Sequence, residues 1–107
     1  MKLKSKVVFL NKKLELEYRG LKETDPIRKF LKRALEKLRE NAYTGSQIPK
    51  RLIPQVYVKQ KINNIWKYNL PNGWRLLYSV AQDEKIEIIT ILLEWSDHKE
   101  YERKMKY

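Results

Sequence analysis

The side chains best suited to chemistry lie in the second half of this sequence. Arg75 stands among apolar residues, and its planar guanidinium can hold a phosphate through two parallel hydrogen bonds. Lys67 lies in the preceding alternating segment, where it could hold phosphate or accept a proton. His98 is the only histidine, and imidazole is the side chain best suited to proton exchange near neutral pH. These residue types favour acid–base chemistry at a phosphate.

Each candidate also has a purely structural interpretation. Arg75 could lie over a sheet and pair with Glu87 or Glu94, and Lys67 could be an exposed strand lysine. His98 could be a surface histidine beside its acidic sequence neighbours, Asp97 and Glu100. Glu94 and Asp97 are possible proton acceptors, but acids among so many cations are more often ion-pair partners.

The sequence has few of the residues that thiol chemistry or metal binding requires. The chain has no cysteine and a single histidine, which excludes disulfides, thiol catalysis and zinc sites built on cysteine. One histidine cannot form a histidine-based metal site alone. We therefore expect chemistry without a metal and without a cofactor.

The charge points to an anionic partner. Lys and Arg number 24 against 13 Asp and Glu, a net charge of +11, and residues 1–62 carry all of this excess. Between Glu40 and Asp83 there is no acid at all. The basic residues inside that stretch are Lys50, Arg51, Lys59, Lys61, Lys67 and Arg75. Such an excess attracts nucleic acid, an acidic protein or an anionic membrane surface, whereas a lysine-rich thermophilic surface is the alternative.

Length and hydropathy predict one soluble, cytoplasmic domain over residues 1–107. The chain is 42% hydrophobic, which is enough for an ordinary core. No apolar run approaches the length of a membrane span, and the apolar segment after the N-terminus is too short for a signal peptide. We expect no membrane partner.

The first half predicts a strand followed by two helices. Residues 7–10 are apolar and β-branched at their start, which is typical of a buried strand. In residues 12–22, alternation favours a strand and i, i+4, i+7 spacing favours a helix; we predict a helix. Asp25 is a good N-cap, Pro26 suits a first helical turn, and the apolar stripe that follows predicts a helix over 26–41.

The polar face of helix 26–41 is basic. Four of its cations occupy the front half, where they oppose the helix macrodipole: Arg28, Lys29, Lys32 and Arg33. A local conflict of this kind can mark function, so we expect these four to contact RNA or a partner protein. A solvated basic face is the alternative.

The second half predicts three antiparallel strands in a meander, at residues 63–70, 74–80 and 85–94. Residues 43–62 predict a loop with at most one short strand at 56–58, because Pro49 and Pro54 interrupt regular structure. We expect residues 98–107 to form a short helix. The fold class is thus α+β: a small four-stranded sheet in which the first strand lies parallel to the apolar third strand of the meander. Of the three tryptophans, we expect at least two to pack in the core or at an edge of the sheet rather than stack on bases.

Three segments carry a resemblance to a known family. Gly73–Tyr78 (GWRLLY) resembles the "G-aromatic-R-hydrophobic-hydrophobic-Y" strand of the RelE/ParE superfamily of small toxins from toxin–antitoxin pairs. Ile65–Tyr68 (IWKY) is similar to the strand that precedes it, and His98–Tyr101 (HKEY) is similar to the terminal segment. The likeness covers residues 63–101, while earlier residues agree in element order and charge.

The resemblance implies an endoribonuclease that cleaves mRNA, often on the ribosome, and that is neutralised by an antitoxin protein. In such enzymes the ribose 2′-OH attacks the adjacent phosphate. The reaction needs a base, cations on the phosphorane and an acid for the leaving 5′-oxygen. The residues matched to these roles are Arg75, His98, Lys67 and Tyr101. Tyr101 could stack on a base, orient the phosphate, or simply pack the tail helix onto the sheet.

Other cations suit affinity rather than catalysis. RNA-backbone binding is expected at Lys50, Arg51, Lys59, Lys61 and Lys99. Lys59 and Lys61 would share one face if their segment were an extended strand.

Two further functions stay open. Many members of the superfamily carry a second basic residue where this chain has Asn69, which favours a non-catalytic protein that binds RNA, the ribosome or an acidic partner. The superfamily also has a gyrase-targeting branch without the nuclease residues. The Arg, His and Tyr kept here favour the nuclease.

Overall fold

The computed structural model describes residues 2–105, excepting the side chains of residues 104 and 105; residues 106 and 107 of the expected tail helix lie outside it. The fold is α+β, as expected, and its sheet is mixed. In chain order the elements are β1 (Lys6–Phe9), α1 (Lys12–Arg19), α2 (Pro26–Glu40), β2 (Ser46–Gln47), the 3₁₀ turn η1 (Lys50–Leu52), α3 (Gln55–Val58), β3 (Trp66–Asn69), the 3₁₀ turn η2 (Pro71–Gly73), β4 (Arg75–Gln82), β5 (Ile88–Ser96) and α4 (His98–Met105).

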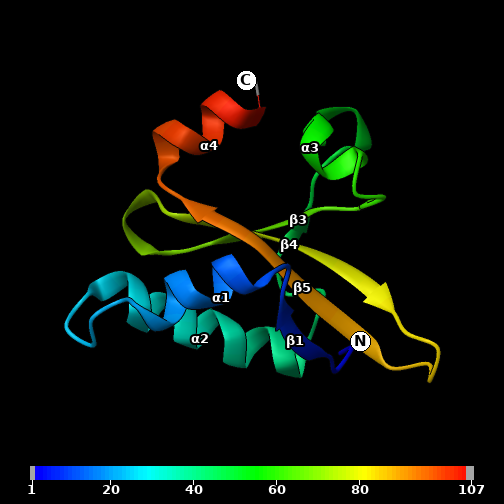
Figure 1. Ribbon diagram of the computed structural model, residues 1–107, viewed down its shortest axis with the longest axis horizontal. Helices are drawn as coiled ribbons and strands as arrows, with labels where there is room; N and C mark the ends of the chain where they lie inside the picture. Colours follow the sequence, from blue (N-terminus) through cyan, green and yellow to red (C-terminus); the bar gives the residue numbers. More distant parts are fainter. Residues whose placement is uncertain (1, 106–107) are drawn as a thin grey trace.

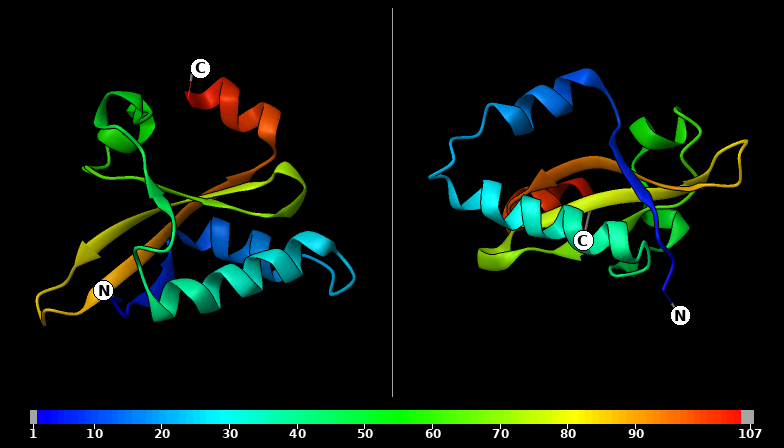
Figure 2. Two further views of the ribbon diagram at one scale, coloured as in Figure 1. Left: turned by 180° about the vertical axis from the view of Figure 1, so that it is seen from behind. Right: turned by 90° about the horizontal axis from the view of Figure 1, so that it is seen from below.

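The elements form three layers around the sheet. The strand order is β1-β5-β4-β3-β2, so β5 is flanked on both sides and β2 is an edge. Helices α1 and α2 lie on one side of the sheet, and α3 and α4 lie on the other (Figure 1). Views from behind and from below show the same division, and they show the β4–β5 turn extending beyond the helices (Figure 2).

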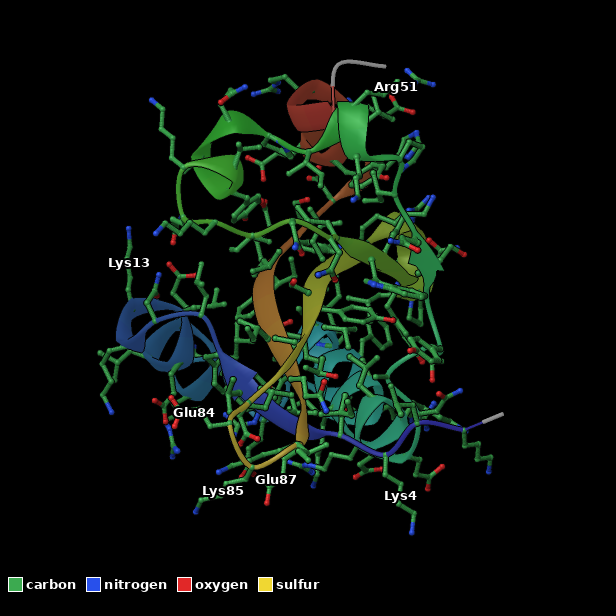
Figure 3. All side chains as sticks on the ribbon, turned by 90° about the vertical axis from the view of Figure 1, so that its right-hand side faces the viewer. Lys4, Lys13, Arg51, Glu84, Lys85 and Glu87 are labelled. Atoms are coloured by element: carbon green, nitrogen blue, oxygen red, sulfur yellow. The ribbon has the colours of Figure 1, made fainter. Side chains whose placement is uncertain are left out.

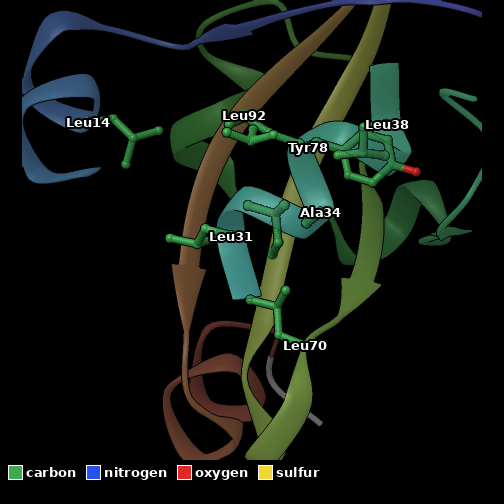
Figure 4. Packing of buried hydrophobic residues seen from close by; sticks show 9 residues of the cluster. Leu14, Leu31, Ala34, Leu38, Leu70, Tyr78 and Leu92 are labelled. Carbon is green, nitrogen blue, oxygen red and sulfur yellow. The ribbon is translucent and has the colours of Figure 1, made fainter. Parts of the chain in front are cut away.

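Helix α2 forms because its caps and its apolar stripe agree. The Asp25 side chain accepts a hydrogen bond from the Ile27 amide at 3.0 Å, which satisfies one of the free donors at the helix start. Its buried side chains are Leu31, Ala34, Leu35 and Leu38. They pack with Leu14, Leu70, Tyr78 and Leu92 into the core between α2 and the sheet (Figure 4).

The ambiguous segment after β1 is helical. Helix α1 begins at the N-cap Asn11, whose side chain accepts from the Leu14 amide at 2.9 Å. It buries Leu14 against the core and ends at Gly20. The alternation of apolar residues that favours a strand here is overridden by this cap and by the i, i+4 packing of the helix.

The strand pairing confirms the predicted crossover. Strand β1 lies parallel to β5, with Lys6 opposite Ile89 and Phe9 opposite Leu92. Both faces of β5 are covered, since Leu92 joins the core beneath α2 and Leu93 joins a second core on the side of α3 and α4. This accounts for the apolar character of the strand on both faces.

Two sequence-based expectations are wrong. The sheet has five strands rather than four, because β2 adds an edge beyond β3 and so changes the strand order. Residues 56–58 lie in the short helix α3, not in a strand. The prolines that signal interruption stand immediately before η1 and α3, where their restricted φ starts a helical turn.

A tight turn connects α2 to β2 and is held from inside the protein. The Tyr78 hydroxyl donates to the carbonyl of Ala42 and accepts from the amide of Gly45, both at 2.9 Å. Gly45 leaves no room for a side chain, since a Cβ there would stand 2.4 Å from the carbonyl oxygen of Lys67. The turn is thus fixed to β3 and β4 at the same time.

No helix within residues 2–105 has the length and apolar character needed to cross a membrane.

Candidate phosphate-binding and catalytic face

The site predicted from the sequence lies on the sheet face opposite α1 and α2. Lys67 pairs with Leu77, and Asn69 pairs with Arg75, so these four side chains project from one face of β3 and β4. The row continues onto β5, where Ser96 lies opposite Arg75. Helices α3 and α4 stand over this face at its two ends (Figure 1).

One aromatic ring from α4 contacts both strand cations. The Lys67 Nζ lies 5.5 Å from the centroid of the Tyr101 ring, and the Arg75 Cζ lies 5.9 Å from it. These distances allow cation–π attraction, which holds each charge over the face of the ring. The structure therefore brings together three of the four residues expected to be catalytic.

Tyr101 itself is buried, with 4% of its surface exposed. It packs with Leu77 and Leu93 in the core on this side of the sheet. This position fits the packing role, because a nucleobase cannot lie on the ring unless α4 moves. The ring still positions two cations.

Arg75 is half-buried and incompletely bonded. Its Nη1 donates to the carbonyl of Trp74 at 3.2 Å, while its Nε is buried without a hydrogen-bond partner. Within residues 2–105 it forms no ion pair, and Glu87 lies at the far end of the β4–β5 hairpin. A guanidinium with unused donors can accept an anion such as phosphate.

His98 lies at the same end of the sheet. A Cβ on Gly73, in the turn that leads into β4, would stand 3.5 Å from the His98 Cβ. Its imidazole is exposed, and Nε2 lies 2.9 Å from the Glu102 carboxylate one turn further along α4. The partner is thus Glu102 rather than the expected Asp97 or Glu100. Asp97 instead caps α4 by accepting from the Glu100 amide at 3.0 Å.

Sequence reasoning missed the bond that ties α3 to this face. The Tyr57 hydroxyl donates to the Glu94 carboxylate on β5. Burial, together with that carboxylate, raises the pKa of Tyr57 well above its ordinary value. The i, i+4 spacing of His98 and Glu102 was visible in the sequence, whereas nothing there links Tyr57 to Glu94.

The cations expected to bind the RNA backbone surround α3 and α4. Lys50 and Arg51 are exposed on η1, Lys59 ends α3, and Lys99 is exposed on α4. The expected extended face for Lys59 and Lys61 is wrong, because Lys61 adopts a left-handed φ of 63° after α3. Figure 3 shows Arg51 reaching into solvent near α3 and α4.

Two of these lysines share a hollow on the α3 side. Lys50 and Lys61 line a pocket of about 410 Å³ together with Ile53, Val58 and Ile62. The folded turn after α3 therefore brings together two charges that are separated in sequence.

The basic residues of α2 form a separate surface. Lys29, Lys32 and Arg33 are exposed on the layer that covers the other side of the sheet, away from Lys67 and Arg75. Arg28 has a structural role: it donates to the carbonyl of Leu21 at 2.6 Å and thereby closes the connection between α1 and α2. Its Cζ also lies 5.6 Å from the Tyr18 ring centroid.

The tryptophans pack as expected. Trp66, Trp74 and Trp95 all lie against the core beneath α2. Among the described residues, no group of three or more His, Asp or Glu side chains is placed to hold a metal ion.

Comparison with family models, curated proteins and solved structures finds no match for this chain.

Proposed function

We propose that this chain is a metal-independent endoribonuclease that acts in the cytoplasm as the toxin of a toxin–antitoxin pair. One observation carries the proposal. Lys67 and Arg75 come from adjacent strands, and both cations lie against the ring of Tyr101. Both come from the segments whose sequence resembles the RelE/ParE superfamily. Ribosome-bound mRNA is the proposed substrate, and an acidic antitoxin is the proposed partner of the basic surfaces.

The proposed chemistry follows from charge and reach. Attack of a ribose 2′-OH on the adjacent phosphate places extra negative charge on the pentavalent phosphorus centre. Arg75, with its permanent charge and planar fork, is suited to stabilise that charge, and Lys67 adds a second cation. His98 serves as general acid or base, with Glu102 orienting the imidazole. The products are a 2′,3′-cyclic phosphate and a free 5′-hydroxyl.

A second candidate is favoured by one specific observation. Tyr101 is buried between α4 and the sheet, so its ring is covered where a substrate would need to reach it. A protein that binds RNA or an acidic partner through the same face, without cleaving it, would tolerate this arrangement.

The first test is to induce the wild type and Arg75→Ala in growing cells and to map new mRNA 5′ ends. The nuclease predicts new ends within translated frames for the wild type and a loss of at least roughly 100-fold for the variant, the scale of one removed oxyanion donor. Lys85→Ala, at the exposed β4–β5 turn, is the matched control and should cleave like the wild type.

Folding and fragment chemistry complete that test. Thermal unfolding of Arg75→Ala separates lost chemistry from lost structure, and Arg75→Lys keeps the charge but loses the fork. Fragments without a cyclic phosphate would contradict attack by the 2′-OH. No new ends with any of these proteins would overturn the nuclease and favour the binding protein, whereas DNA damage alone would point to a gyrase-directed toxin.

A further inference from the structure

An exposed aromatic ring stands on the opposite side of the sheet from the candidate site. Tyr43, in the turn after α2, is 50% exposed. Its ring stacks on Trp66 with centroids 5.2 Å apart and an interplanar angle of 28°. Trp66 in turn stacks on the buried Tyr78 at 6.2 Å and 20°. Three near-parallel rings therefore lead from the core to the surface and end at Tyr43.

The position of this ring is fixed before any ligand arrives. Asn41 accepts hydrogen bonds through Oδ1 from the amides of Tyr43 at 3.1 Å and Leu3 at 3.0 Å. Tyr78 holds the same turn from inside through Ala42 and Gly45. Ordering of the protein would weaken the binding of a stacked ligand only slightly, because hydrogen bonds already fix the turn that carries Tyr43.

Exposed cations lie on the segments that meet the turn of Tyr43, which directly follows Glu40. The turn opens the stretch of 42 residues, from 41 to 82, that contains no acid. The Ala42 amide donates to the carbonyl of Leu3 at 2.7 Å, which brings the N-terminal arm and its Lys2 and Lys4 alongside the turn. Lys4 extends into solvent (Figure 3). An aromatic platform among cations is the arrangement by which proteins bind single-stranded nucleic acid.

We propose that Tyr43 is a base-stacking platform for single-stranded RNA, outside the candidate catalytic face. The inference rests on the proposed function only for the identity of the ligand, and it requires no cleavage. The two-residue edge strand β2 separates the two regions, with Ser46 paired to Lys67 and Gln47 paired to Trp66. Because Trp66 and Lys67 alternate on β3, an RNA strand that crosses this edge meets Tyr43 on one side and Lys67 on the other.

The test measures binding of an uncleavable probe, a fluorescently labelled 2′-O-methyl oligonucleotide of ten adenosines. Tyr43→Leu removes the ring but keeps an apolar cover over Trp66, and it should weaken binding by roughly 10-fold, the scale of one lost base stack. The dependence on salt should not change, because no phosphate contact is lost. Tyr43→Phe keeps the ring and should bind like the wild type.

Two controls separate stacking from other effects. A ten-unit abasic oligonucleotide carries the phosphates without bases and should bind the wild type and Tyr43→Leu equally. Leu16→Ala removes an exposed apolar residue from α1 and should leave adenosine binding unchanged. Thermal unfolding of each variant establishes that it is folded.

The inference is overturned if the wild type does not bind the adenosine probe, or if Tyr43→Leu binds this probe as tightly as the wild type does. It is also overturned if Tyr43→Leu weakens binding of the abasic probe by the same factor as binding of the adenosine probe. Its failure is distinct from failure of the proposed function. Cleaved RNA with no effect of Tyr43→Leu on binding would remove the platform and keep the nuclease. Binding that depends on the Tyr43 ring, without any cleavage of RNA, would keep the platform and remove the nuclease.

Discussion

Two buried tyrosine hydroxyls hold loops onto the sheet. Tyr57 donates to Glu94 and fastens α3, whereas Tyr78 bonds Ala42 and Gly45 and fastens the turn after α2. Burial raises the pKa of Tyr78 to about 12, and burial beside Glu94 raises that of Tyr57. Each hydroxyl therefore stabilises the folded state most while it is protonated.

These raised pKa values predict a loss of stability in alkali. The folded state holds the Tyr78 proton more tightly than the unfolded chain, whose phenol titrates near its ordinary value of 10.0. The stabilisation is therefore complete below pH 10 and declines as the pH rises from 10 towards 12. Urea unfolding at pH 9, 10 and 11 should show a midpoint that falls little between pH 9 and 10 and more between pH 10 and 11.

A matched variant identifies the group responsible for that decline. Tyr78→Phe should be less stable than the wild type at pH 9 but should lose less stability between pH 9 and 11. An absorbance titration in which every tyrosine ionises near pH 10 in the folded protein would contradict the assignment.

Lys67 and Arg75 could be predicted from the sequence because alternation and a turn signal place them on paired strands. Their meeting with Tyr101 could not, since it depends on α4 folding back over the sheet. The same is true of Tyr57 and Glu94, which come from elements far apart in the chain. Local pattern identifies which side chains share a strand face, whereas the opposing layer is determined by tertiary packing.

At the scale of elements, the turn between α2 and β2 connects the two candidate RNA contacts. It carries Tyr43 and leads into the edge strand that pairs with β3. Its backbone approaches β3 at Gly45, where a Cβ would stand 2.4 Å from the Lys67 carbonyl oxygen and 2.8 Å from the Tyr78 hydroxyl.

Gly45→Ala should therefore destabilise the fold. The added methyl must displace backbone rather than a flexible side chain, and we expect a loss of about 3 kcal/mol in the free energy of unfolding. Gly20→Ala is the control: its backbone is right-handed helical and the closest approach is 3.2 Å, so the change should be smaller. Urea unfolding measures both, and equal stability of Gly45→Ala and the wild type would show that the turn can move away.

Helix α2 was predictable to within one residue because its cap, its proline and its apolar stripe are all local. Residues 43–62 were not. Strand β2 has only two residues, too few for a period, and it exists because β3 offers an edge. Pro49 and Pro54 start short helical turns rather than ending regular structure, since a proline at a helix start loses no hydrogen bond.

At the scale of the whole molecule, the positive charge is spread over both layers. The cations around α3 belong to the layer on the side of the candidate site, and those of α2 belong to the layer on the opposite side of the sheet (Figure 1). RNA binding should accordingly weaken steeply as salt rises, because each neutralised phosphate releases a counterion.

The slope of that dependence tests which lysines touch phosphate. Each lost contact to a single strand should lower the slope of log Kd against log salt concentration by about 0.7. Lys50→Ala combined with Lys61→Ala, at the shared hollow, should lower it by about 1.4. Lys85→Ala should leave it unchanged, and a double variant with the wild-type slope would remove this hollow from the RNA path.

The parallel pairing of β1 with β5 bears on how the chain matures during synthesis. Residues 6–9 leave the ribosome 83 residues ahead of their partners at 89–92. Until then the first strand has no neighbour in the sheet, and contacts of such long separation form slowly. The face that carries Arg75 is completed by β5 and α4, which both follow β4 along the chain. The candidate site therefore assembles only after β5 and α4 have emerged from the ribosome, which delays any activity of this domain until all of these elements have been made.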